Sequence, residues 1–169
     1  GVEAARACLN NGSGSPDIVY FASTSAPFAD RQNAGIISTA LGLSEDLASA
    51  DITSSQRAGT TALIQALAAV QGGLYQNALI VAADKRRTRA ASPGELAYGD
   101  AGVAMSVGVD NPLVELVAVH STTVDFIDHF RGASEEFDYT WEERWIRDEG
   151  LAKIVPPCID KALAKAGLA

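Results

Sequence analysis

The sequence predicts an α/β fold in which helices cover a largely buried central sheet. Short apolar runs, rich in β-branched and aromatic residues, alternate along the chain with longer segments of helical periodicity. Several of these runs are apolar at nearly every position, which is typical of strands buried on both faces. Because 47% of the 169 residues are hydrophobic, the chain can also fill a core.

Strands are expected wherever a short apolar run lies between turn-forming residues. The clearest run, at 77–84, is continuously apolar and ends in an acid, which favours an interior strand. The last two runs are separated by the turn residues Asp110, Asn111 and Pro112. The expected strands span residues 17–22, 48–53, 77–84, 101–108 and 113–119.

Helices are expected between and after these strands. The segment 57–72 is almost wholly small or apolar, which predicts a helix buried on all sides. Pro156 and Pro157 fall in the first turn of the final helix, where proline is tolerated. The polar, proline-bearing stretch 85–95 is predicted to be a loop. The expected helices span residues 2–9, 30–41, 57–72, 142–146 and 154–166.

Composition excludes several classes of function. The net charge of -8 and the absence of a broad basic patch argue against nucleic-acid binding. The basic run KRRTR at 85–89 has two interpretations, a solvated loop or a local phosphate site. Two distant cysteines, Cys8 and Cys158, provide neither a disulfide framework nor a metal site, which favours a reducing, cytoplasmic setting. No apolar run approaches the roughly 20 residues of a membrane span.

The stretch 51–60, DITSSQRAGT, resembles the nucleophile segment of two thiolase-superfamily branches, the 3-hydroxy-3-methylglutaryl-CoA (HMG-CoA) synthases and the ketoacyl synthase III family. In those families a strand ends in a short turn that bears cysteine, followed by Arg-Ala-Gly-Thr or similar and then a buried helix. Three further segments follow the family order, namely 21–25 (FASTS), 82–84 (AAD) and 98–104 (YGDAGVA). The resemblance implies a thiolase-like layered αβαβα core, of which this chain holds mainly the N-terminal half-repeat.

The same resemblance divides the chain at residue 120. Residues 1–120 correspond to the thiolase-like N-terminal half, and 121–169 to an insertion and the start of the second half-repeat. The family's catalytic histidine is then expected outside this chain. Segments 128–131 and 142–150 resemble the insertion of HMG-CoA-synthase-like proteins that work with a zinc-ribbon/OB-fold subunit. The resemblance also implies a homo- or hetero-dimer, expected to pair through the strand at 79–83.

Motif alignment places Gln56 in the position of the family's cysteine nucleophile. A thiol at a helix N-terminus has a lowered pKa, and its thiolate attacks the acyl-CoA thioester. An amide is not a nucleophile. Ser55 is the adjacent catalytic candidate, although Ser54 and Ser55 are simply interpreted as helix-capping residues. Thr24 falls where HMG-CoA synthases place their glutamate base, so that role is also unfilled.

Three interpretations of Gln56 stay open. The amide mimics an acylated cysteine, another residue performs C–C chemistry on the CoA thioester, or the protein is a noncatalytic partner. The resemblance therefore implies an acyl-CoA-handling protein, either an HMG-CoA-synthase-like acyltransferase or a C–C lyase, without the cysteine nucleophile. The alternative is a noncatalytic thiolase-like subunit that binds a catalytic or zinc-ribbon/OB-fold partner. Acyl-CoA is the expected substrate, and no bound cofactor is expected.

The remaining candidates are cations and histidines. The residues expected to contact substrate, chiefly the CoA phosphates, are Thr24, Arg57, Arg86, Arg87 and Arg89. His120 and His129 are the two histidines of the chain, and each is expected to be a packing or surface residue. Asp128 lies beside His129, which makes an acid–base pair a weaker alternative.

Overall fold

The computed structural model describes residues 1–12 and 14–168, which fold as two compact units. The first unit combines Gly1–Arg86 with Leu96–Pro112, and the second combines Arg87–Glu95 with Leu113–Ala169. The predicted division after residue 120 follows a family repeat, which contacts within this chain do not test, and it stays a prediction.

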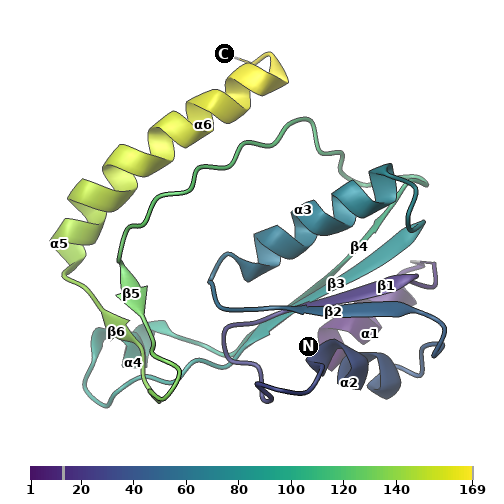
Figure 1. The fold of residues 1–169 in the computed structure, drawn as a ribbon, viewed down its shortest axis with the longest axis horizontal. Helices are drawn as coiled ribbons and strands as arrows, with labels where there is room; N and C mark the ends of the chain where they lie inside the picture. Colours follow the sequence, from purple (N-terminus) through teal and green to yellow (C-terminus); the bar gives the residue numbers. More distant parts are fainter. Residues whose placement is uncertain (13, 169) are drawn as a thin grey trace. The chain divides into compact units, whose positions relative to one another are not determined.

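The first unit is built on a four-stranded mixed sheet with the order β2-β1-β3-β4 (Figure 1). Its strands are β1 (Ile18–Ala22), β2 (Ala48–Ile52), β3 (Asn77–Asp84) and β4 (Ala101–Gly108). β1 runs parallel to β2 and β3, whereas β4 runs antiparallel to β3. These four predicted strands are confirmed. β3 pairs with a strand on each side, β1 and β4. The expected dimer through the strand at 79–83 stays a prediction.

Helices cover both faces of this sheet (Figure 1). α1 (Val2–Asn10) and α2 (Asn33–Ala40) lie on one face, and α3 (Ala58–Gln71) lies on the other. Side chains of β1 alternate between the two cores. Ile18 and Ala22 pack toward α3, and Val19 and Phe21 pack toward α1 and α2. The predicted buried central sheet is therefore confirmed for this unit.

α3 is buried along one stripe, not on all sides. The buried side chains recur every four residues, at Ala58, Ala62, Ala66 and Val70. Thr60 and the other residues of the opposite side are partly or fully exposed. The described part of the chain supplies one sheet face for this helix to pack on. The prediction of an all-round buried helix is therefore wrong for this chain by itself.

The second unit contains a small hairpin and a long helical segment. β5 (His129–Phe130) pairs antiparallel with β6 (Tyr139–Thr140). α5 (Glu143–Trp145), the π-helical turn η1 (Ile146–Leu151) and α6 (Ala152–Ala166) then follow without interruption. A short helix, α4 (Pro93–Ala97), begins inside the stretch 85–95 that was predicted to be a loop and crosses the boundary between the units at residue 95.

The predicted strand at 113–119 is not formed. Leu113 is 101% exposed and Val114 is 87% exposed, and no described strand pairs with this stretch. An apolar β-branched run becomes a strand only when another strand accepts its backbone hydrogen bonds. The apolar pattern alone does not supply that partner.

The two prolines of the last helix also depart from expectation. α6 begins at Ala152 and continues directly from η1, so Pro156 and Pro157 lie inside the helix and not in its first turn. A proline there donates no N–H to the carbonyl four residues earlier. The helix nevertheless continues past both residues to Ala166.

Candidate functional site

The carboxyl ends of three parallel strands meet at one edge of the sheet. The turn at 23–25 follows β1, the turn at 53–57 follows β2, and Asp84 is the last residue of β3. Because β1 is the middle strand of the three, the 23–25 turn lies between Asp84 and the turn that carries Gln56. In open α/β sheets, ligands bind outside the carboxyl ends of the strands. This edge is therefore the candidate site.

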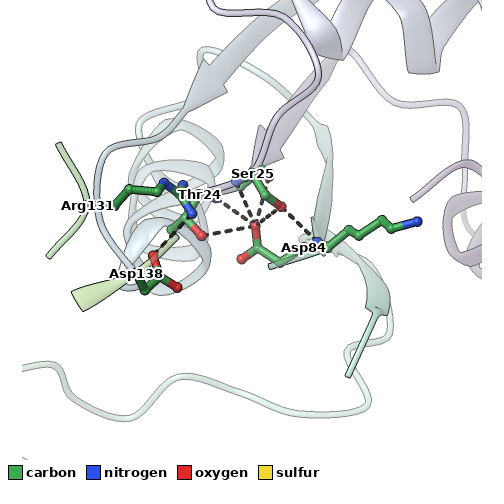
Figure 2. Close-up of polar contacts among 7 residues, drawn as sticks. Thr24, Ser25, Asp84, Arg131 and Asp138 are labelled. Carbon is green, nitrogen blue, oxygen red and sulfur yellow. Dashed lines mark hydrogen bonds and ion pairs between the residues drawn. The ribbon is translucent and has the colours of Figure 1, made fainter. Parts of the chain in front are cut away.

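Asp84 ties the end of β3 to the turn after β1. Its Oδ1 accepts hydrogen bonds from the hydroxyls of Ser23 and Ser25, at 2.9 and 2.8 Å. It also accepts from the backbone N–H groups of Thr24 and Ser25, at 2.8 and 3.0 Å, and from the Thr24 hydroxyl at 3.2 Å. Figure 2 shows these bonds converging on one carboxylate oxygen. The turn is thereby fixed at the strand ends.

This network keeps Asp84 ionised. Partial burial raises the pKa of the carboxyl, but the hydrogen bonds from Ser25, Thr24 and Ser23 outweigh it and hold the pKa below its ordinary value. At neutral pH the side chain is a carboxylate that accepts hydrogen bonds and has no proton to donate. The sequence marks Asp84 only as an acid at the end of an apolar strand. Its hydrogen-bond partners lie about 60 residues earlier in the chain, so the sequence pattern does not reveal them.

A second aspartate, which sequence reasoning did not single out, caps α2. Asp51 Oδ2 accepts from the backbone N–H of Asn33 at 2.7 Å and from its side-chain amide at 2.9 Å. Asp51 Oδ1 accepts from the N–H of Ala34 at 2.7 Å. Asp51 belongs to β2, so its carboxylate fixes a helix N-terminus from a different element. No local cap motif reveals this contact.

The turn between β2 and α3 has the expected strand–turn–helix form. Ser54 has a φ of 70°, in the left-handed region that is uncommon for residues other than glycine. The Ser55 hydroxyl accepts the N–H of Arg57 at 3.1 Å, so Ser55 caps the approach to the helix. Gln56 lies in this turn and is exposed in this chain. It therefore does not point into a closed pocket formed by the described residues.

A separate pocket of about 560 Å³ lies at the same edge of the sheet. Its apolar wall includes Phe21, Ile36 and Ile37, which places it toward α2 and away from α3. Polar groups at the pocket include Asp84 and Lys85. Gln56 does not line it.

Comparisons with known proteins identify the relatives of this fold. The hydroxymethylglutaryl-CoA synthase of Archaeoglobus fulgidus is 32% identical over 133 residues, 77% of this chain and 38% of the relative. That of Methanocaldococcus jannaschii is 35% identical over 136 residues, 77% of this chain and 39% of the relative. Over these residues the chain is similar in sequence to the hydroxymethylglutaryl-CoA synthases. It spans about two fifths of the length of these relatives. No family model matches it.

Solved structures show the same fold. A structure of MvaS in complex with 3-hydroxy-3-methylglutaryl coenzyme A superposes with a TM-score of 0.80 at 22% identity, over 98% of this chain and 41% of that chain. The 3-oxoacyl-(acyl carrier protein) synthase III of Pseudomonas aeruginosa gives 0.81 at 21% identity, over 98% and 55%. At such identities the likeness establishes the fold, and it confirms the predicted thiolase-like class.

The predicted phosphate-binding residues are divided between the two units. Arg57 is exposed beside the Gln56 turn, and the guanidinium of Arg86 lies 4.7 Å from the centre of the Tyr98 ring. Arg87 and Arg89 belong to the second unit, where Arg87 forms an ion pair with Glu136. Thr24, the other predicted contact, is part of the Asp84 network.

Both histidines of this chain lie in the second unit. His129 Nδ1 is 2.8 Å from the carboxylate of its neighbour Asp128, so the two side chains are in contact. Their role as an acid–base pair stays a prediction. His120 Nε2 is 3.3 Å from the Thr122 hydroxyl.

In residues 1–12 and 14–168 no group of three or more acidic, His or Cys side chains is arranged to hold a metal ion. Within those same residues, no helix has the length and apolarity to cross a membrane.

Proposed function

We propose that this chain forms the nucleophile-turn half of an acyl-CoA-handling thiolase-superfamily protein. Its reaction is that of an HMG-CoA-synthase-like acyltransferase or of a C–C lyase on a CoA thioester, and Gln56 occupies the cysteine position. The observation that supports this proposal is the β2–turn–α3 unit with Gln56 in the turn, in a homologue of hydroxymethylglutaryl-CoA synthases. Under this proposal, the substrate of the whole protein is an acyl-CoA thioester.

The chemistry of this turn changes with the residue at position 56. The N-terminus of α3 favours negative charge and would stabilise a thiolate placed before it. The side chain of Gln56 has no ionisable group, and its carboxamide carries a carbonyl as an acylated cysteine does. The proposed protein therefore binds acyl-CoA without forming an acyl-enzyme at this position.

Acyl transfer tests the assignment directly. The natural polypeptide is incubated with radiolabelled acetyl-CoA, denatured and counted for covalent label. We expect no label on the wild type and label on Gln56→Cys, because the variant restores a thiol before α3. Ser55→Cys, which places the thiol one residue earlier, is the matched control and should stay unlabelled. Stable acylation of the wild-type chain would sink the proposal.

Binding is tested by thermal protection. A ligand present at about 100 times its Kd stabilises a protein by about 2.7 kcal/mol. Acetyl-CoA should therefore raise the Tm of the natural polypeptide, while ADP at the same concentration should not. Equal protection by both ligands would mean that only the nucleotide part is recognised, which contradicts a thioester site.

A noncatalytic subunit is the second candidate, favoured by the unreactive amide of Gln56. The partly exposed outer side of α3 gives such a subunit an uncovered surface in this chain. The proposed partner is a cysteine-bearing paralogue or a zinc-ribbon/OB-fold subunit, in a cytoplasmic setting and as a hetero-dimer. Tagged polypeptide should then co-purify in stoichiometric amount with one of these two proteins. Homo-dimers without either partner favour the first candidate.

A further inference from the structure

Three aromatic side chains form one face of the β5–β6 hairpin in the second unit. Phe130 and Tyr139 lie directly opposite each other in the strand register, and their ring centres are 5.1 Å apart. Trp141 follows Tyr139 by two residues and therefore lies on the same side, with its ring centre 6.0 Å from that of Tyr139. The three residues are 45–51% exposed. We call Phe130, Tyr139 and Trp141 the aromatic face.

Contacts at both ends of the hairpin hold the backbone beneath the aromatic face. Arg131 directly follows β5 and Asp138 directly precedes β6, and Arg131 Nη1 is 3.1 Å from Asp138 Oδ1. The side chain of Asp138 is 5% exposed, so little water competes for this contact. Beyond β6, the N–H of Trp141 donates to the carbonyl of Asp128 at 2.8 Å. The rings are therefore positioned before any partner arrives, which lowers the entropy cost of binding.

The inclination of the rings suits a cation. The planes of the Tyr139 and Trp141 rings meet at 68°, and those of Phe130 and Tyr139 at 38°. Aromatic rings at such angles form the walls of cages that bind cations, because the face of each ring is electron-rich. A planar guanidinium also stacks on a ring face. The same chain shows this contact elsewhere, between Arg86 and the ring of Tyr98.

The segment that carries the aromatic face is strongly acidic. Residues 125–149 contain nine acidic and three basic residues, a net charge of -6 out of -8 for the whole chain. Ion pairs neutralise some of these carboxylates, for example Asp138 with Arg131 and Glu136 with Arg87. Most of the negative charge is left over, so the segment attracts cationic partners and repels phosphate-bearing ones.

We propose that the aromatic face docks an arginine-rich segment of a partner protein. Arginine satisfies both observations, because its guanidinium stacks on inclined rings and its charge complements the acidic segment. An apolar segment would gain nothing from the carboxylates, and a lysine-rich segment would gain less from the rings. The proposal concerns the second unit alone. It does not depend on Gln56 or on the proposed acyl-CoA chemistry, so either can fail without the other.

Peptide binding tests this docking surface. Two fluorescent peptides of equal length, one alternating Gly with Arg and one alternating Gly with Lys, are titrated with the natural polypeptide and followed by anisotropy. The buffer contains about 0.15 M salt, which screens charges more than about 8 Å apart. We expect the arginine peptide to bind about threefold or more tightly than the lysine peptide, since the two differ in stacking and not in charge.

A matched pair of variants locates the binding. Trp141→Leu keeps an apolar side chain but removes one ring of the aromatic face, and it should bind the arginine peptide about three- to tenfold more weakly than the wild type. Trp145→Leu removes a similarly exposed ring that stacks on Phe126 instead, and it should equal the wild type.

Two results would overturn the proposal. One is a wild type that binds the arginine peptide no more tightly than the lysine peptide, which leaves charge as the sole attraction. The other is an equal affinity of Trp141→Leu and Trp145→Leu for the arginine peptide, which places the binding elsewhere. If Trp141→Leu fails to fold by circular dichroism, the comparison of the two peptides on the wild type decides.

Discussion

The Asp51→Ala variant should unfold at a markedly lower denaturant concentration than the wild type, because it lacks the β2 carboxylate that caps α2. Two backbone N–H groups lose their partner, those of Asn33 and Ala34, both at 2.7 Å. Asn33 is 4% exposed and Ala34 is 0% exposed, so water has little access to replace the carboxylate. Loss of an N-cap costs about 0.5–2 kcal/mol, and a buried unpaired donor about 1–3 kcal/mol.

These costs overlap, since the cap and the buried donors are the same groups. We therefore expect the free energy of unfolding to fall by about 2–4 kcal/mol in Asp51→Ala. Asp51→Asn keeps a neutral oxygen and should lose roughly half as much. Asp46→Ala, at an exposed position before β2, is the control and should change stability by less than about 0.5 kcal/mol.

Urea titration followed by circular dichroism measures all three variants. The midpoint should shift with little change in the slope, because the surface exposed on unfolding is nearly the same. An Asp51→Ala protein as stable as Asp46→Ala would refute the reasoning. It would mean that α2 begins without help from β2.

Three further outcomes follow from packing and charge. Leu79→Ala empties a site that is 1% exposed on the interior strand and should cost about 2–5 kcal/mol, whereas Leu74→Ala at 70% exposure should cost little; urea midpoints compare them. Gly150→Ala would place its Cβ 2.5 Å from the ring of Phe126, so that ring must shift, and near-ultraviolet circular dichroism should change with a loss of about 1–3 kcal/mol. The pKa of Asp84 is lowered in the folded chain, so its ionised form stabilises the fold above the pKa of the unfolded chain, and this contribution is lost as pH falls through the lowered folded pKa. The difference in free energy of unfolding between the wild type and Asp84→Asn should therefore become smaller below pH 4. A difference that grows in acid would contradict this prediction.

The strand predictions succeeded where a run was apolar on both faces and failed where a partner was needed. β3 was predicted at 77–84 and is found there, because a buried central strand leaves a continuous apolar signal. The stretch 113–119 carries a similar signal, but no strand in the described part of the chain pairs with it. Apolar residues report a tendency to be buried, whereas a strand also needs a neighbour with matching register.

The contacts of the site were beyond sequence reasoning for a related reason. Asp84 was recognisable as an acid that ends a strand, but its bonds to Ser23 and Ser25 depend on β1 and β3 being neighbours. Asp51 acts across sequence gaps of 17 or 18 residues. Motif resemblance located the Gln56 turn because strand, turn and helix are contiguous there. Contiguous features were predictable, and features made by packing of distant segments were not.

In the turn before α3, the residues that hold the fold differ from the residue at the nucleophile position, Gln56. The fold around it depends on Ala58, which is 4% exposed and begins the buried stripe of α3, and on the Ser55 cap of the helix approach. Gln56 itself is exposed in this chain, so its side chain contributes no core packing here. A substitution at such a position usually changes stability by less than about 0.5 kcal/mol. Gln56→Cys can therefore restore a nucleophile without altering the frame, and a variant that folds normally but gains no acyl label would place the fault in the assigned chemistry, not in the fold.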